Sequence, residues 1–534
     1  SPCGWNVDHA SQKHTSDAAS LLFTEKHITS DLTLPTIGAS GTTISWKSSN
    51  PSVLSNEGKV TRPKKGAADE EVTLKGTVKM GDYAKARKFA FVVLAESEMG
   101  PTKEFALDQV ELLDDYYLTA QNSDIEFLKK FDNDRLLSRF RETAGLDTKK
   151  IAPYGGWEDG WLGGHSVGHY LTAIAQAVKA TGNADLKEKS KQLIKGLAEC
   201  QNKLGTGFIF GAKIETEGYV EKQFDILEGK TTGKTWVPWY NMHKMLTGLV
   251  DTYKYTGNKQ ALEVAKKLGD WIYNRVSKWD AGTQGRVLGT EYGGMNDCLY
   301  ELYLCTRDSK HLEAAHKFDE PNLYKTVAKG GKNCLNGKHA NTTIPKFLGA
   351  LKRYVVLEQT GELTKDDEAY LTNVEKFFDI AVTRHAYITG GVSVMEHFRK
   401  DNNQDGTRTQ TNCESCCAHN MLKMAKELYK VTGDKKYADY YETTLRNSIM
   451  GAVKSESGAA AYFIPMATGY FKTFGNEDPA KNMFWCCTGS GMENFTKLGD
   501  SIYFHANDTL IVNQYVSSKV TWEEKNLVVT QKSD

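Results

Sequence analysis

The sequence predicts a mainly α-helical protein: an (α/α)6 barrel, preceded by an Ig-like β-sandwich and followed by the start of a C-terminal β-domain. Apolar residues recur with helical spacing between about residues 105 and 505, whereas the residues on either side of this stretch form short strand-like runs. One type of helix end recurs along the helical part. The 534 residues also exceed what a single compact core usually holds. We therefore expect three parts, 1–97, 98–505 and 506–534.

Residues 1–97 are expected to contain an N-terminal segment and a β module. The run Thr43-Ile44-Ser45-Trp46 and the run from Phe89 to Leu94 have strand character, and Asn50-Pro51 marks a turn between them. This pattern resembles a small bacterial Ig-like sandwich, a module that accompanies extracellular enzymes. Because such modules accompany extracellular enzymes, we expect a secreted or cell-surface protein. The first residues contain no basic-then-apolar signal segment, so we expect that the signal peptide has been removed.

The central part contains a recurring helix end followed by a new helix start. In such a pattern glycine takes the left-handed position after a helix, and Asn or Asp begins the next element. Five or six helical hairpins over roughly 400 residues favour a closed barrel over an open solenoid, with the site built by long loops on one face. The repeated ends are Thr181-Gly182-Asn183, Thr256-Gly257-Asn258, Thr306-Arg307-Asp308, Thr360-Gly361-Glu362 and Thr432-Gly433-Asp434.

Strand-like runs return after residue 506. They cover Thr509 to Tyr515, Val520 to Trp522 and Leu527 to Thr530. Three strands make a poor independent sheet. Either these strands pack on the barrel, or they begin a C-terminal β-sandwich that continues beyond this chain.

The charge balance excludes one large class of partner. Lys+Arg and Asp+Glu both number 67, so the net charge is 0. Nucleic-acid-binding proteins normally carry a basic surplus that neutralises phosphates. No apolar run approaches the ~20 residues that cross a bilayer. We therefore expect no nucleic acid and no membrane span, and a neutral or uncharged substrate.

Half of the ten cysteines fall into two tight clusters. The first is Asn412-Cys413-Glu414-Ser415-Cys416-Cys417 and the second is Trp485-Cys486-Cys487. Disulfide frameworks spread their cysteines along the chain, whereas clustering favours metal binding or catalysis. The two clusters can supply a four-ligand zinc site, which normally leaves no position for a reactive water. A structural zinc site, a zinc-bound thiolate nucleophile and inert thiols all remain open on spacing alone.

Several motifs occur in the order typical of one enzyme group. They are Tyr387-Ile388-Thr389-Gly390-Gly391, Glu396-His397-Phe398, Glu414-Ser415-Cys416, Tyr462-Phe463-Ile464-Pro465 and Cys486-Cys487. With them, residues 105–530 resemble the β-L-arabinofuranosidases of glycoside hydrolase families 127 and 146. The chain differs from the family pattern at Met395, Ser415 and Thr488, where the families show Gly, Thr and Pro.

The resemblance implies a retaining exo-glycoside hydrolase that releases a terminal pentofuranose, β-L-arabinofuranose, from plant glycans or glycoproteins. It implies Cys486 as the nucleophile and Glu396 as the acid/base, the pair that a retaining mechanism needs. Burial against Phe398 is expected to raise the pKa of Glu396. The implied zinc (Zn2+) ligands are Glu414, Cys416, Cys486 and Cys487, and the implied sugar contacts are His243, His339, Tyr462 and His165.

Two other classes of function remain alternatives. A non-catalytic carbohydrate-binding protein with a structural zinc would show no turnover. A different (α/α)6 glycosidase or lyase would act through carboxylates, or through Tyr, His and Arg, and would not need the paired Cys486 and Cys487. Zinc content and thiol sensitivity distinguish the three.

Overall fold

A computed structural model describes residues 9–23, 26–96, 101–212, 219–474 and 483–533. The chain divides into two compact units. The first contains residues 1–100 and 432–436, and the second contains residues 101–431 and 437–534. Within the described residues no helix has both the length and the apolarity that crossing a membrane requires.

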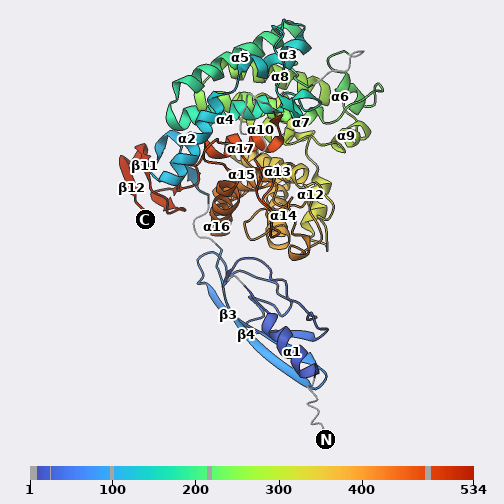
Figure 1. Ribbon diagram of the computed structural model, residues 1–534, viewed down its shortest axis with the longest axis vertical. Coiled ribbons are helices and arrows are strands. Elements are labelled where there is room, and N and C mark those ends of the chain that lie inside the picture. The colour runs from blue at the N-terminus through green and yellow to red at the C-terminus, as the bar shows by residue number, and fades with distance from the viewer. Residues whose placement is uncertain (1–8, 24–25, 97–100, 213–218, 475–482, 534) are drawn as a thin grey trace. The chain divides into compact units, whose positions relative to one another are not determined.

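The first unit contains a four-stranded sheet in the order β1-β4-β3-β2. Its two long strands, β3 and β4, are labelled in Figure 1. Its strands are β1 (His27–Ile28), β2 (Thr43–Ser48), β3 (Glu70–Met80) and β4 (Tyr83–Val93), with β2–β3 and β3–β4 antiparallel. The β3–β4 hairpin turns at Gly81, where φ is 60°. Helix α1 (His9–Ser20), which the sequence analysis did not anticipate, packs on β3 and β4. Alternate apolar side chains on β3 and β4 form this unit's core, as a half-buried sheet requires.

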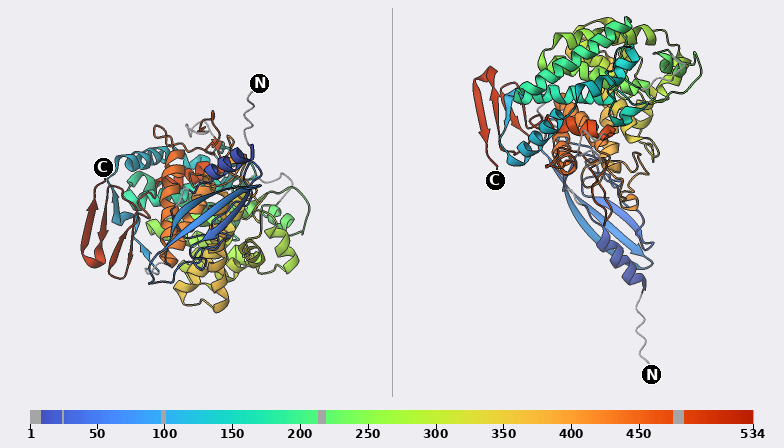
Figure 2. Two further views of the ribbon diagram at one scale, coloured as in Figure 1. Left: turned by 90° about the horizontal axis from the view of Figure 1, so that it is seen from below. Right: turned by 45° about the horizontal axis from the view of Figure 1, so that its top comes forward.

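The second unit is an (α/α)6 barrel, which confirms the predicted fold class. Six helices of the described chain are buried over most of their surface and form the inner layer, as their apolar composition requires. Figure 2 shows the helical unit from two further sides. The inner helices are α4 (His165–Thr181), α7 (Pro238–Thr256), α10 (Met295–Thr306), α13 (Ala340–Thr360), α15 (Ser415–Thr432) and α17 (Cys486–Phe495).

Amphipathic helices with one solvent-facing side cover the inner layer. They alternate with the inner helices along the chain and pack on them. These outer helices are α2 (Asp115–Lys129), α5 (Ala184–Leu204), α8 (Lys259–Val276), α11 (Ser309–His316), α14 (Glu368–His385) and α16 (Lys435–Thr444). The remaining helices of the unit are α3 (Asn133–Ala144), α6 (Lys222–Leu227), α9 (Ala281–Leu288) and α12 (Pro321–Ala328).

Each of the five predicted helix ends terminates an inner helix. The residue after each helix is left-handed, with φ between 56° and 73°, and four of the five are glycine. Asn183 and Asn258 then cap the outer helices α5 and α8 through their side chains. The recurring motif therefore marks the C-terminal end of an inner helix. The opposite ends of these helices have no recurring motif.

Close packing of two inner helices depends on glycine. A Cβ at Gly168 of α4 would lie 2.1 Å from the carbonyl oxygen of Lys244 on α7, and one at Gly248 would lie 2.6 Å from the carbonyl oxygen of Gly168. Only glycine permits this separation of backbones. The close α4–α7 contact fixes the relative positions of His165 and His243.

The C-terminal strands pair with the segment that precedes the barrel. Strands β9 (Tyr503–Ala506) and β10 (Thr509–Val512) form a sheet with β5 (Lys103–Glu104). Strands β11 (Ser518–Trp522) and β12 (Leu527–Gln531) form another with β6 (Val110–Leu112). A two-residue parallel pair, β7 (Gly155–Gly156) and β8 (Met483–Phe484), precedes α17. All of these strands belong to the second unit.

Candidate active site

The predicted site residues gather at the N-terminal ends of the inner helices. Cys486 and Cys487 are the first two residues of α17, and Cys416 is the second residue of α15. His339 caps α13 and His165 begins α4. Neighbouring cysteines on a regular helix point apart, so a shared site requires a helix start. Helix N-termini also stabilise thiolates.

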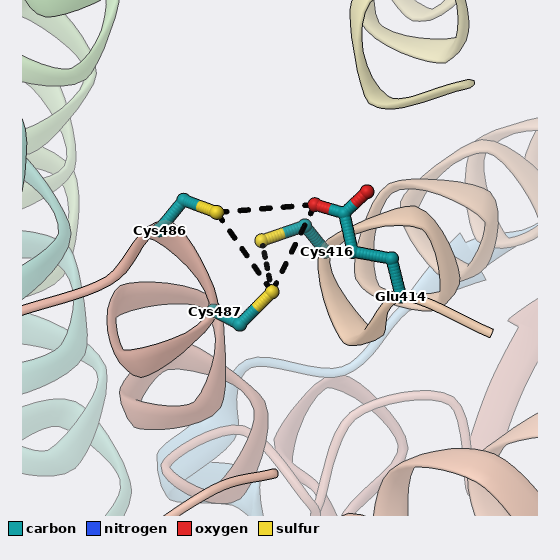
Figure 3. A group of neighbouring side chains, drawn as sticks. All are labelled: Glu414, Cys416, Cys486 and Cys487. Atoms are coloured by element: carbon teal, nitrogen blue, oxygen red, sulfur yellow. Dashed lines mark hydrogen bonds between the residues drawn. The ribbon is translucent and has the colours of Figure 1, made fainter. Parts of the chain in front are cut away.

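Glu414, Cys416, Cys486 and Cys487 face one another, as Figure 3 shows, and each lies within 4.8 Å of the others. The Cys416 and Cys487 sulfurs are 3.0 Å apart, and Cys486 Sγ lies 3.8 Å from Cys487 Sγ. Both Cys486 Sγ and Cys487 Sγ lie 3.8 Å from Glu414 Oε1. All four side chains are buried. Three sulfurs and one carboxylate oxygen are donors that suit a closed tetrahedral zinc site.

Burial and hydrogen bonds shape the protonation of the carboxyl and thiol groups in this cluster. Desolvation raises the pKa of Glu414, of Cys416 and of Cys487 well above the ordinary values. In contrast, hydrogen bonds from Cys416 and Cys487 lower the pKa of Cys486 well below its ordinary value. Cys486 is therefore the sulfur of the group that most readily becomes a thiolate, the reactive form of cysteine.

Two further side chains, Cys417 and Ser490, donate hydrogen bonds to members of the cysteine group. The Cys417 thiol donates a hydrogen bond to Glu414 Oε2 at 3.4 Å, which leaves Oε1 toward the cysteines. The Ser490 hydroxyl donates to Cys416 Sγ at 3.1 Å. Partners of this kind orient metal ligands. The sequence analysis noticed Cys417 without giving it a role and missed Ser490, which lies one turn after Cys486 on α17.

Tyr462 connects the cysteines to the predicted acid. Its hydroxyl lies 3.3 Å from Cys486 Sγ and donates a hydrogen bond to Glu396 Oε1. His339 Nε2 lies 3.5 Å from Glu396 Oε2. Met395 and Glu396 both have left-handed backbones, with φ of 47° and 66°, a conformation that costs energy for residues other than glycine. The structure thus brings Cys486, Glu396, Tyr462 and His339 together.

The pKa of Glu396 does not follow the expectation from sequence. The hydrogen bond from His339 and a further one from Tyr462 outweigh burial, so the pKa of Glu396 falls below its ordinary value instead of rising. Phe398 does not provide the expected apolar cover, because its ring packs against His385, with the ring centres 5.2 Å apart. Burial opposes protonation of His339, but Glu396 and Glu291 raise its pKa overall.

The other two predicted sugar contacts lie deeper in the barrel. His165 is fully buried, and its Nδ1 lies 2.6 Å from the carbonyl oxygen of Leu162. His243 Nδ1 accepts a hydrogen bond from the Gly294 amide at 2.9 Å, and its ring lies against Gly293 and Gly294. Nε2 of each histidine is buried without a hydrogen-bond partner. Both histidines therefore have a donor or acceptor left for a ligand or water.

Glu291 is a carboxylate that the sequence analysis missed. Desolvation raises its pKa, and His339, Thr342, Cys486 and Lys244 are the groups that influence it. It lies four residues before the start of the inner helix α10, and this position in the sequence was the available signal. It adds a third carboxylate to the surroundings of Cys486, after Glu396 and Glu414.

Two family models match the chain. A family model described as the β-L-arabinofuranosidase GH127 catalytic domain matches residues 109–500, and a model of an atrophied bacterial Ig domain matches residues 15–96. A solved GH127 β-arabinofuranosidase is 19% identical over 82% of this chain and 68% of its own, with a TM-score of 0.57.

A second solved structure is the GH127 β-L-arabinofuranosidase from Geobacillus stearothermophilus T6. It is 18% identical over 77% of this chain and 68% of its own, with a TM-score of 0.56. A third, a glycoside hydrolase, is 16% identical over 82% and 68%, with a TM-score of 0.53. No curated protein sequence matches the chain.

Proposed function

The chain belongs to the GH127 β-L-arabinofuranosidase family and is a glycoside hydrolase, and on this premise we propose that it is a retaining exo-enzyme releasing terminal β-L-arabinofuranose from plant glycans or glycoproteins. One observation carries the proposal. The Tyr462 hydroxyl joins the Cys486 sulfur to the Glu396 carboxylate at the edge of the buried cysteine group. A retaining glycosidase needs such a nucleophile and acid/base pair.

Zinc is the cofactor that we propose for the buried group. Glu414, Cys416, Cys486 and Cys487 would hold it, since thiolates and carboxylates are ordinary zinc ligands and all four lie within 4.8 Å of one another. When bound, zinc keeps the coordinating thiols deprotonated. Cys417 and Ser490 would keep Glu414 and Cys416 in place.

The chain's own residues account for both steps. In the first, the Cys486 thiolate attacks the anomeric carbon, a C–S bond forms, and the bond to the leaving oxygen breaks. That oxygen takes a proton held by the pair of Glu396 and His339. In the second step the Glu396 carboxylate accepts a proton from water as the water oxygen attacks the same carbon. The C–S bond breaks, the thiolate returns, and two inversions give net retention.

Location outside the cytoplasm is part of the same proposal. We place the protein in the secreted or cell-surface fraction because residues 15–96 match an Ig-like domain, a type common on cell surfaces. Its partner would be an arabinofuranosyl glycan or glycoside. Immunodetection of the protein in culture medium or on intact cells tests this part, and recovery only from the cytoplasm would contradict it.

Turnover of an aryl β-L-arabinofuranoside by the wild type and by Cys486→Ala tests the function. We expect kcat to fall by at least about 10³-fold in the variant, because no other group forms the covalent intermediate. Circular dichroism and elemental zinc analysis establish that the variant is folded and report its metal. Cys305→Ser, at the far end of α10, is the matched control and should keep full activity.

Two outcomes would count against the proposal. Full activity of Cys486→Ala would remove the nucleophile from the mechanism. Absence of turnover by a folded, zinc-loaded wild type on any β-L-arabinofuranoside would favour a structural zinc in a carbohydrate-binding protein, for which a closed four-ligand set is typical.

A further inference from the structure

Three tryptophans from distant parts of the sequence meet beside the nucleophile. Trp157 lies at the centre, with ring centres 5.6 Å from Trp236 and 5.3 Å from Trp485. The interplanar angles are 64° and 86°, so the rings meet edge to face and do not cover one another's faces by stacking. Trp485 is the residue immediately before Cys486 and caps α17. We call Trp157, Trp236 and Trp485 the tryptophan trio.

Exposure separates this trio from the tryptophans that fill the barrel. Trp236 is 45% exposed, whereas Trp239, three residues later on the same segment, is wholly buried among other aromatic rings. The two tryptophans are equally apolar, but only Trp239 belongs to α7 and packs in the barrel core. A large aromatic side chain left in water near a reactive residue is a typical contact for a ligand.

Polar and aromatic side chains both surround the cysteine group. Glu396, His339 and Tyr462 are the charged and polar ones. Trp157 packs against an apolar cluster of Leu162, Val237 and Tyr240, and the Lys244 ammonium lies 5.2 Å from the centre of the Tyr240 ring. Through Trp157, the rings of this cluster are continuous with Trp485, the residue that precedes Cys486.

We propose that the tryptophan trio is a subsite for the sugar ring on the leaving-group side of the scissile bond. The proposal rests on the proposed function. In an exo-enzyme the terminal sugar occupies the buried end of the site, at Cys486, so the rest of the glycan must extend toward the exposed residues at its edge. A sugar ring presents a face of C–H bonds that packs on aromatic rings, so three tryptophans that meet edge to face suit a sugar ring as occupant.

The test compares two substrates in Trp236→Ala. One is methyl β-L-arabinofuranoside, whose leaving group is too small to reach the trio. The other is a disaccharide in which β-L-arabinofuranose is linked to a second arabinose. We expect the variant to lose about five- to tenfold in kcat/KM on the disaccharide, mainly through KM, and less than about twofold on the methyl glycoside. Tyr515→Ala, a 73% exposed aromatic outside the trio, is the control and should change neither.

Equal losses on both substrates, or no loss on the disaccharide, would overturn the subsite. A larger loss on an arabinosylated hydroxyproline peptide than on the disaccharide would overturn the assignment to a sugar ring. If the wild type hydrolyses neither glycoside, the proposed function fails, and calorimetric binding of arabino-oligosaccharides tests the trio separately. Binding by the wild type that Trp236→Ala loses supports a sugar surface, whereas equal binding, or none to the wild type, contradicts it.

Discussion

The two ends of the inner helices use charged and reactive groups in opposite ways. At the N-terminal ends, four potential metal ligands crowd within 4.8 Å, and His165 and His243 each have an unpartnered ring nitrogen. At the C-terminal ends, a cavity of about 200 Å³ is lined by lysines and carboxylates in equal number. These are Lys254, Lys352, Lys423, Lys426, Lys430 and Lys497 with Glu104, Asp251, Asp297, Glu301, Glu427 and Glu493.

Most charges at the C-terminal ends are paired within the protein. Lys254 and Lys352 both contact Glu301, at 2.7 and 2.6 Å, and Lys426 and Lys430 both contact Glu104, at 3.1 Å. Buried charges are costly unless they are paired, and these contacts offset that cost at the C-terminal ends. At the N-terminal ends, by contrast, Nε2 of His165 and Nε2 of His243 are buried without a hydrogen-bond partner. The comparison indicates that the reactive groups lie at the N-terminal ends of the inner helices, which we call the unbalanced end. We call the C-terminal ends, where most charges are paired, the balanced end.

The largest expected effect is at the unbalanced end. Glu396→Gln should lower kcat by about 10²- to 10⁴-fold, because an amide can neither donate the proton to the leaving oxygen nor accept one from water. Zinc content should stay unchanged, since Glu396 lies outside the group of four. Steady-state kinetics and elemental analysis measure both. Asp405→Asn, an exposed acid nearby, should remain within twofold of wild type, and a similar loss there would point to a general electrostatic effect.

Removing an ion pair at the balanced end should lower the free energy of unfolding and leave the catalytic rate unchanged. Glu301→Gln leaves Lys254 and Lys352 without their shared carboxylate, and we expect the free energy of unfolding of the barrel to fall by about 3 kcal/mol. Urea unfolding measures this. Glu126→Gln, from a surface pair with Lys129, should change it by less than about 0.5 kcal/mol. Lost activity in a folded Glu301→Gln would mean that this end takes part in catalysis.

The affinity of the unbalanced end for zinc can be lowered without replacing any of the four proposed zinc ligands. Cys417→Ala removes the donor to Glu414 Oε2, and we expect zinc affinity to fall about tenfold because the carboxylate is no longer held. Competition with a fluorescent chelator gives the affinity directly. Cys417→Ser should restore most of it, and Cys298→Ala, whose thiol donates to a backbone oxygen in α10, should not change it. Unchanged affinity in Cys417→Ala would make Cys417 a packing residue only.

The smallest expected effect concerns Asp124, and it tests whether a buried carboxylate without a partner lowers the stability of the fold. Asp124 of α2 is wholly buried, and neither of its oxygens has a hydrogen-bond partner. Desolvation raises its pKa well above the ordinary value. Its contribution to stability is therefore complete below the unfolded pKa of about 4 and is lost as the pH rises toward the folded pKa.

Asp124→Asn removes that loss, so its Tm should exceed that of the wild type by a few degrees at pH 8, with a smaller difference at pH 4. Differential scanning calorimetry at the two pH values measures the change. Asp405→Asn again serves as the exposed control. An equal shift at both pH values would show that ionisation of Asp124 is not the cause.

The sequence by itself determined the features that depend on local chemistry. Five of the six inner helices are followed by a glycine or arginine in the left-handed conformation, and these residues are Gly182, Gly257, Arg307, Gly361 and Gly433. The close spacing within the two cysteine clusters predicts that Cys416 and Cys486 lie at helix starts, because neighbouring residues inside a regular helix point apart. The sequence could indicate Glu414, Cys416, Cys486 and Cys487 as one group because each pair of them is close in the chain.

Only the tertiary structure decided the contacts between distant segments. Tyr462 lies between Cys486 and Glu396, and Ser490 donates to Cys416, because segments far apart in sequence converge at one end of the barrel. The pKa of Glu396 fell rather than rose because it depends on which neighbours donate to the carboxylate. Trp236, two residues before α7, is exposed, whereas Trp239 in the first turn of α7 is buried. Local spacing fixes backbone conformation, whereas the partners of a side chain depend on how the whole barrel closes.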